Sequence, residues 1–252
     1  MVDGWVAFPA GILISTVVTA VGIGGGILWM PFFILLLKLP SDTAILTSLL
    51  IQTFGKGSGS FAYLRQGSVD LKAAAALLSV AMPGVATGAV IASRIRPSHL
   101  ELLLGSLVLA TAFLFVSSNQ RYTDTGTRRV AVKTVYRYSW VALTVSVGSG
   151  MLSTGLGEWL IPIMRNRLGL NMRNAIATCI FVTFVACVAG AGFHIFLGGR
   201  ADWNVIRFAV PGVIIGGQAG PKITRMINER RLKEIFIFLM TLIGIHLIYN
   251  SY

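Results

Sequence analysis

The feature that most constrains this chain is a succession of apolar stretches that runs along its whole length. Several of them approach or exceed 18 residues, which is long enough for a helix to span a bilayer. Only 12% of the 252 residues are charged and the mean hydropathy is +0.77, whereas a soluble domain carries about 25% charged residues. We therefore predict an all-α integral membrane protein with a single transmembrane domain over residues 1–252.

The basic residues cluster between the apolar stretches. A net charge of +12 on a soluble protein would suggest a nucleic-acid partner. Here the basic run "RYTDTGTRRVAVKTVYRY" (121–138) lies between two apolar regions, and loop cations of this kind set the orientation of a membrane protein. We therefore expect the lipid bilayer as a partner and no nucleic acid.

No pattern of reactive residues indicates an enzyme. The sequence contains no GxSxG, HExxH or Walker motif, and its three histidines are scattered. Cys179 and Cys187 lie in one apolar segment and form neither a disulfide framework nor a CxxC metal motif. We predict a protein that is not an enzyme and has no catalytic residues, cofactor or metal site.

The chain repeats itself at a constant offset. The stretch "GIGGGILWMP" (22–31) aligns with "STGLGEWLIP" (153–162). In this register the matched pairs include Gly24 with Gly155, Gly26 with Gly157, Pro31 with Pro162, Thr47 with Thr178, and Gly59 with Gly190. Glycine and leucine match by chance in apolar chains, but proline and threonine in register argue for a true repeat. Such repeats suggest two halves with a site between them, here 5–118 and 138–250 around a connector at 119–137.

The glycines of the first repeat mark a break in a helix. We expect apolar segments at 5–22, 27–37, 43–64, 71–93 and 98–118, and in the second half at 138–153, 158–164, 174–198, 203–222 and 232–250. One helix over 5–38 would be about 51 Å long, whereas the hydrocarbon core is about 30 Å thick. The run must therefore tilt strongly or break, and glycines favour a break.

Loop charges distinguish four membrane passes per half from five. With four passes the basic residues divide almost evenly between the two sides. With five, Lys38, Arg94, Arg96 and Arg200 share one side and the other loop lysines and arginines share the opposite side, as the positive-inside rule requires. We therefore predict two inverted repeats of about five membrane segments each, with broken helices at Gly-rich turns, both termini outside and the connector in the cytoplasm.

The turn formed by Gly24, Gly25 and Gly26 is a candidate anion site. A glycine turn that opens a helix leaves several N–H groups unpaired at the positive end of the helix dipole, and such a terminus suits an anion. The alternative is that these glycines serve close helix packing. A dinucleotide fingerprint is excluded because long apolar segments of helical length flank the glycines, where that motif needs a strand.

The stretch "AILTSLLIQTFGKGSGSFAYL" (44–64) is the most polar of the apolar segments. Its candidate substrate-binding residues are Thr47, Ser48, Gln52 and Lys56, which share a broad helix face. A lysine within the membrane is a functional candidate, and the alternative is a lysine that snorkels to the interface.

The matching stretch of the second half supplies Asn174, Thr178 and Thr183. Thr178 is the repeat mate of Thr47, and Thr183 is the repeat mate of Gln52. We expect these residues to line the site, although hydroxyl groups also bond within membrane helices.

Three further titratable residues lie within or next to apolar segments. The planar fork of Arg207 suits an oxyanion, or the side chain reaches back to the interface. Glu158 follows the second glycine turn and could couple protons or pair with a cation. His194 could carry a proton or lie at the interface.

The chain resembles the TauE/SafE family of bacterial membrane permeases, described as sulfite and organosulfonate exporters. The stretches that carry the resemblance are "GIGGGILWMP", "AILTSLLIQTF", "YLRQGSVDLKAAAALL" and "PGVATGAVIASRI", with weaker second-half counterparts. It covers nearly the whole chain and is specific for the family but not for the substrate. It implies that the Gly24–Gly26 turn, the Thr47–Ser48 pair and Thr178 lie near the transport path. The second half departs from the repeat at Leu156, Glu158 and Cys179.

Together these features lead to a functional hypothesis. We expect a gradient-driven secondary carrier in the bacterial cytoplasmic (inner) membrane that exports a small sulfur-containing anion, such as sulfoacetate or another sulfonate, or sulfite. The alternatives are a carrier for another small anion and an anion channel. The small anion and the lipid bilayer are the expected partners, and the sequence leaves a homodimer open as an assembly.

Overall fold

The structure is a computed structural model that describes residues 4–117, 126–154 and 156–223 together with Thr241, Ile245 and Tyr249. All named elements of these residues are helical, which confirms the predicted all-α class. The predicted segment 232–250, apart from Thr241, Ile245 and Tyr249, lies outside the described residues.

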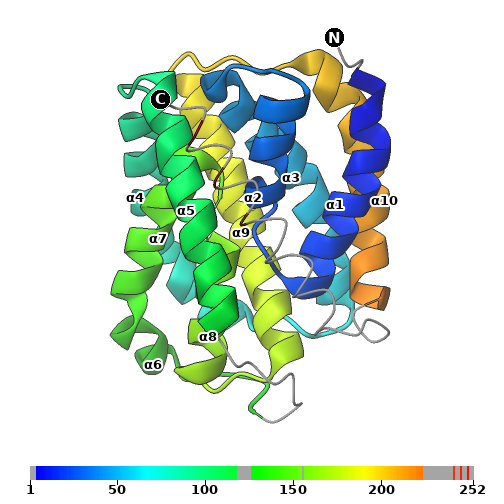
Figure 1. Ribbon diagram of the computed structural model, residues 1–252. Helices are drawn as coiled ribbons and strands as arrows, with labels where there is room; N and C mark the ends of the chain where they lie inside the picture. Colours follow the sequence, from blue (N-terminus) through cyan, green and yellow to red (C-terminus); the bar gives the residue numbers. More distant parts are fainter. Residues whose placement is uncertain are drawn as a thin grey trace.

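The helices follow one another closely along the chain (Figure 1). In the first half they are η1 (Gly4–Val6), α1 (Ala7–Val21), α2 (Gly26–Pro31), η2 (Phe32–Leu36), α3 (Ser41–Arg65), α4 (Leu71–Ala92) and α5 (Pro97–Ser117). They continue with α6 (Val132–Arg137), α7 (Ser139–Leu152), α8 (Leu156–Asn166), α9 (Met172–Phe196) and α10 (Trp203–Ile223). Every predicted segment from 5–22 to 203–222 overlaps one of these helices. The short helix α6, within the basic connector, was not predicted.

The first glycine run breaks the helix, as predicted. Gly22 takes a left-handed conformation with φ 80° and its N–H donates to Val18 O, which ends α1. The chain then reverses, and α2 begins at Gly26. Pro31 lacks an N–H group, and the helix continues beyond it as the π-helix η2. In Figure 1, α1 runs toward the lower end of the molecule and α2 lies inside it.

Three helical segments among the described residues are long and apolar enough to span a membrane, judged by length and composition. They are Gly4–Val21, Leu71–Ala92 and Met172–Phe196. The segments Gly26–Leu36, Pro97–Phe113 and Ser139–Leu152 are apolar but shorter. The structure therefore has the composition of a membrane protein.

Two pairs of parallel helices flank the central helices α3 and α9. In the first pair α1 packs along α10, and in the second α7 packs along α4. Between the pairs, α3 contacts α10 and α9, while α9 contacts α3 and α4. Within each pair the two helices approach each other closely because small residues face the backbone of the partner helix, as is common where membrane helices pack.

The α4–α7 contact depends on Gly150. A Cβ at this position would lie 2.2 Å from the carbonyl oxygen of Val85 on α4, whereas a Cβ at Gly148, on the same helix, would meet nothing within 4 Å. The two glycines therefore differ in packing but not in secondary structure.

We expect Gly150→Ala to lower the midpoint of thermal unfolding in detergent, because the added methyl group must push α7 away from α4. Overpacking of this kind costs roughly 1–3 kcal/mol. The matched control Gly148→Ala should leave the midpoint unchanged or raise it slightly, since alanine favours a helix over glycine. Equal midpoints for the two variants would contradict the described packing.

Candidate functional site

Two glycine turns from distant parts of the chain meet inside the molecule. The first turn lies between α1 and α2, and the second lies between α7 and α8. Ser153 ends α7 with φ 59°, as Gly22 ends α1, and its N–H donates to Ser149 O at 2.9 Å. A Cβ at Gly26 would lie 1.8 Å from Ser153 O, and a Cβ at Gly157 would lie 2.6 Å from the nitrogen of Gly24. The two turns therefore pack backbone against backbone, which only glycine allows at these two positions.

Gln52 ties the central helix α3 to the second turn. Its Nε2 donates to the Oγ of Ser153 at 2.7 Å, to the Oγ of Ser48 at 2.9 Å and to Ser153 O at 3.1 Å. The Ser153 hydroxyl in turn donates to Ser48 Oγ at 3.0 Å. The other amide atom, Gln52 Oε1, is buried and has no hydrogen-bond partner among the described residues. It faces the first turn, because a Cβ at Gly25 would lie 2.9 Å from it.

Glu158 brings a carboxylate against the first turn. The side chain is 1% exposed, and a Cβ at Gly24 would lie 2.6 and 2.7 Å from its two carboxylate oxygens. Glu158 also lies in the first turn of its own helix, α8. Two helix starts thus point their positive ends toward one carboxylate, which stabilises its charge.

Lys56 is enclosed by protein one helical turn beyond Gln52. Its side chain is 4% exposed, and its Nζ lies 3.9 Å from the Sγ of Cys187 on α9. The neighbouring Cys179 places its Sγ 3.8 Å from Gly157 O, and the charges of Lys56 and Glu158 both reach its thiol. A cation and an anion therefore lie near the same pair of turns.

Thr47 and Thr178 serve the ends of other helices. The hydroxyl of Thr47 accepts a hydrogen bond from the N–H of Asp202 at 2.9 Å, just before α10. The hydroxyl of Thr178 accepts one from the N–H of Asp70 at 3.0 Å, just before α4. These two repeat mates thus make the same contact at opposite ends of the molecule.

The remaining predicted site residues lie in different surroundings. Thr183 donates to Cys179 O on its own helix at 2.9 Å. Asn174 donates to Arg128 O at 3.2 Å, at the connector. Arg207 is exposed on α10 with its guanidinium 4.9 Å from the ring centre of Phe208. The structure thus gathers the three glycines, Ser48, Gln52 and Lys56, but does not bring Arg207 or Asn174 to them.

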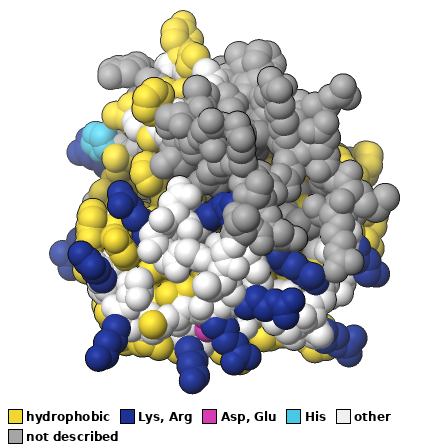
Figure 2. All heavy atoms as spheres, turned by 90° about the horizontal axis from the view of Figure 1, so that it is seen from below, with side chains coloured by type: hydrophobic (Ala, Val, Ile, Leu, Met, Phe, Trp, Pro, Cys, Tyr) yellow, Lys and Arg dark blue, Asp and Glu magenta, His cyan; other side chains and the backbone are white. Residues whose placement is uncertain are grey.

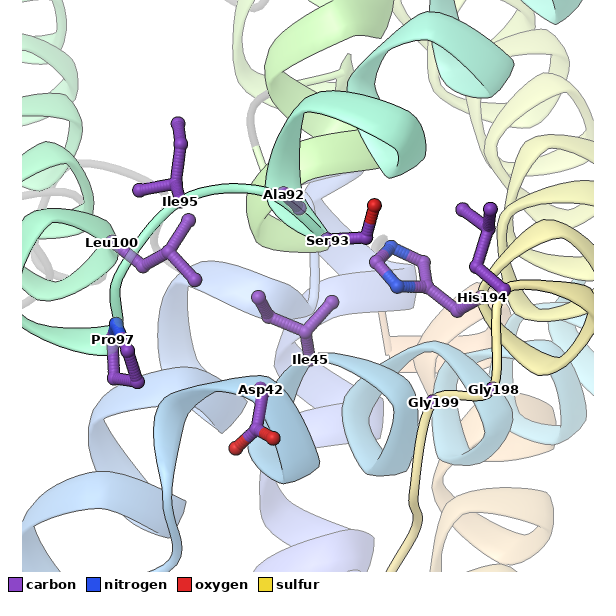
Figure 3. A pocket seen from close by; sticks show the side chains of 11 residues that line it. Asp42, Ile45, Ala92, Ser93, Ile95, Pro97, Leu100, His194, Gly198 and Gly199 are labelled. Atoms are coloured by element: carbon purple, nitrogen blue, oxygen red, sulfur yellow. The ribbon is translucent and has the colours of Figure 1, made fainter.

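A separate pocket of about 250 Å³ opens near the ends of α3, α4, α5 and α9 (Figure 3). Among its lining residues are Asp42, Ser93, Pro97, His194 and Gly198. The Nε2 of His194 lies 2.8 Å from Gly150 O, so this histidine is bonded to α7. No local sequence pattern predicts this pocket, because its walls come from three stretches far apart in the chain, at 42–45, 92–100 and 194–199.

No group of three or more His, Cys, Asp or Glu side chains that could hold a metal ion occurs within the described ranges. The polar groups around the glycine turns are hydroxyls, one amide, one amine and one carboxylate. This set can hold a small ion by hydrogen bonds and charge.

Comparisons with known proteins identify the family to which this chain belongs. The family model described as "Sulfite exporter TauE/SafE" matches residues 7–247. The probable membrane transporter protein YunE of Bacillus subtilis is 25% identical over 96% of both chains. YdhB of the same organism, also named a probable membrane transporter protein, is 22% identical over 94% of this chain and 97% of its own. The probable membrane transporter protein ORF9 of Sinorhizobium is 24% identical over 89% of this chain and 85% of its own.

No solved structure matches the chain significantly. The family match extends over nearly all of the sequence, from α1 to beyond α10, and includes both glycine turns. The chain therefore belongs to the sulfite exporter TauE/SafE family of membrane transporters.

Proposed function

We propose that this protein is a gradient-driven secondary carrier that exports a small sulfur-containing anion, a sulfonate such as sulfoacetate or sulfite, from the cytoplasm. The observation that carries the proposal is the meeting of two glycine turns beside the enclosed Lys56. Backbone N–H groups at a helix start attract an anion, and a buried cation offsets the cost of removing its charge from water. The family match supports the substrate class.

An inverted repeat would explain how two such turns come together. In Figure 1, α1 runs downward and α7 runs upward, and these two helices are repeat mates in the sequence. The parallel pairs α1–α10 and α7–α4 are then the same contact made twice, as are the Thr47 and Thr178 hydrogen bonds. These features support two inverted halves with the site at their interface, an arrangement typical of secondary carriers.

The distribution of cations supports one orientation in the membrane. In Figure 2, which views the molecule from below, Lys and Arg side chains lie along the left, lower and right margins of the lower face and toward its middle. In Figure 1, α3, α8 and α10 end and α4 and α9 begin toward the lower end, where α6 also lies. The described cations at or next to these helix ends are Arg65, Lys72, Arg128, Arg129, Lys133, Arg137, Arg165, Arg167, Arg173 and Lys222, whereas Lys38, Arg94, Arg96 and Arg200 lie in the loops at the opposite ends of the helices. We propose that the lower face lies in the cytoplasm of the bacterial inner membrane.

The alternatives are a carrier for another small anion and an anion channel. A carrier exposes its site to one side at a time, so its flux saturates with substrate concentration, whereas channel flux continues to rise. The enclosed position of Lys56 and Glu158, 4% and 1% exposed, favours a carrier because neither side chain lines an open pore.

The role of Lys56 can be tested by binding. We expect a panel of sulfonates, sulfite, sulfate and carboxylates to show tightest binding for a sulfonate or sulfite, and Lys56→Gln to weaken it. Loss of a charge-assisted contact to a buried anion costs roughly 2–5 kcal/mol, which is about 30- to 4000-fold in Kd. Calorimetry on purified protein measures the change.

Two further variants complete this binding experiment. Lys72→Gln removes an exposed lysine at the start of α4 and should bind as the wild type does. Arg207→Ala tests the other cation predicted from the sequence. If Arg207→Ala abolishes binding while Lys56→Gln does not, the anion lies at α10 and the proposed site is wrong.

The glycine turn can be tested by transport. The three atoms nearest to a Cβ at Gly25 would all belong to the Gln52 side chain and to no backbone, so we expect Gly25→Val to insert normally but to displace Gln52 and lose uptake in proteoliposomes. Gly192→Val is the control, because a Cβ at Gly192 meets nothing within 4 Å. A Gly25→Val protein with full activity would leave only a packing role for this residue.

The orientation can be tested by labelling single cysteines. Arg96→Cys lies in an exposed turn of the upper end and Lys133→Cys on an exposed face of α6, while the two natural cysteines are buried. In intact cells a membrane-impermeant maleimide should label Arg96→Cys only, and lysis should expose Lys133→Cys. Labelling of Lys133→Cys before lysis would reverse the orientation.

A further inference from the structure

Each helix break leaves a backbone carbonyl that the helix itself no longer uses. The two carbonyls are those of Thr19 in α1 and Gly150 in α7. In a continuous helix they would accept from the N–H groups four residues later, at Ile23 and Thr154. Neither N–H makes that bond in the described part of the chain, because the backbone turns away where α1 and α7 end. A buried carbonyl without a partner is costly, so each break needs a donor from elsewhere.

Two side chains of the central helices supply these donors. The hydroxyl of Tyr63 on α3 donates to Thr19 O at 2.8 Å. The Nε2 of His194 on α9 lies 2.8 Å from Gly150 O, and it donates because a carbonyl oxygen only accepts. Tyr63 is 1% exposed and His194 is 7% exposed. Both hydrogen bonds are therefore largely shielded from water.

The sequence repeat pairs these two contacts with each other. Tyr63 is the repeat mate of His194, and Thr19 is the repeat mate of Gly150. The side chain and the carbonyl lie 44 residues apart in both cases. Tyr63 lies near the lower end of α3 and His194 near the upper end of α9 (Figure 1). Because two chemically different side chains make the same contact, the shared feature is the hydrogen bond to the carbonyl and not the ring.

We propose that Tyr63 and His194 are positioning residues, which hold the two glycine turns in the conformation that binds the anion. This inference rests on the proposed function, because it takes the turns as the binding site. Each bonded carbonyl belongs to the last turn of a helix that ends at Gly22 or at Ser153. A helix that loses its donor relieves the unpaired carbonyl by moving its last turn, and the glycine turn moves with it. Neither side chain needs to touch the anion.

The second turn shows how such a displacement would reach the site. Ser153 accepts hydrogen bonds from Gln52 through its hydroxyl and its carbonyl oxygen. The same carbonyl lies against Gly26 of the first turn, and Gly157 packs against the nitrogen of Gly24. A shift at the end of α7 would therefore disturb the contact with α3 and the packing of both turns.

Position 194 offers a matched pair of variants. His194→Tyr keeps a donor, because tyrosine makes the equivalent contact in the first half, whereas His194→Phe has the same ring without the hydroxyl. The pocket of about 250 Å³ that His194 lines leaves room for either ring (Figure 3). We expect methanesulfonate to bind His194→Tyr as it binds the wild type. It should bind His194→Phe about 5- to 150-fold more weakly, since an unpaired buried carbonyl disfavours the binding conformation by this factor.

The first half has its own variant and the chain offers a control. Tyr63→Phe removes only a hydroxyl and should weaken binding over the same range. Thr111→Val is the control, because the buried hydroxyl of Thr111 donates at 2.8 Å to Leu107 O within the continuous helix α5, and its affinity should equal that of the wild type. Equal affinities of His194→Tyr and His194→Phe, or wild-type affinity of Tyr63→Phe, would overturn the proposal.

Hydrogen–deuterium exchange tests the same bonds without a ligand. His194→Phe should speed amide exchange more at 151–154 than at 20–24, and Tyr63→Phe should do the reverse, because each lost donor frees its own turn. Unchanged exchange at the turns, or equal acceleration throughout the protein, would overturn the positioning role while leaving the anion site intact. If neither methanesulfonate nor sulfite binds the wild type, the proposed function fails and so does its link to these residues, whereas the exchange pattern still decides whether they hold the turns.

Discussion

The contact between the two glycine turns determines where the other elements can lie. Because Gly26 and Gly157 have no side chain, each turn touches the backbone of the other, and α1 and α7 end inside the molecule. Non-helical backbone is tolerated at membrane depth only where protein or a water-filled cavity shields it. The central helices α3 and α9 provide that shield, and Gln52 bonds directly to the second turn. The site is therefore a consequence of how the helix breaks are packed.

Helix starts at both ends of the molecule depend on the same central helices. Asp70 accepts hydrogen bonds from the first N–H groups of α4, and Asp202 does so for the first N–H groups of α10. The N–H of each aspartate in turn donates to a threonine of α9 or α3. The threonines thus fix the outer helices to the central pair. If α3 moved against α9, these hydrogen bonds would tend to move α10 with α3 and α4 with α9.

The sequence predicted the helices well because apolar length and glycine breaks are local signals. It predicted the surroundings of single side chains less well. Helical spacing placed Thr47 with Gln52 on one broad face, but only the packing shows that Thr47 turns to α10 while Gln52 turns to Ser153. Similarly, the position of Arg207 five residues into a segment could not show that its side of α10 is exposed. The contact of Glu158 with Gly24 joins residues more than a hundred positions apart, and no local pattern encodes it.

The residues that the sequence repeat pairs with one another around the turns differ in charge. The repeat pairs around the turns are Ile27 with Glu158, Ser48 with Cys179, Gln52 with Thr183, and Lys56 with Cys187. Were these side chains as symmetric as the helices, the interior would hold two like charges, which repel strongly at low dielectric. Instead, among the described residues around the turns, the first half supplies the amine of Lys56 and the second half supplies the carboxylate of Glu158. If the halves are inverted as we propose, the symmetric backbone allows the site to open to either side.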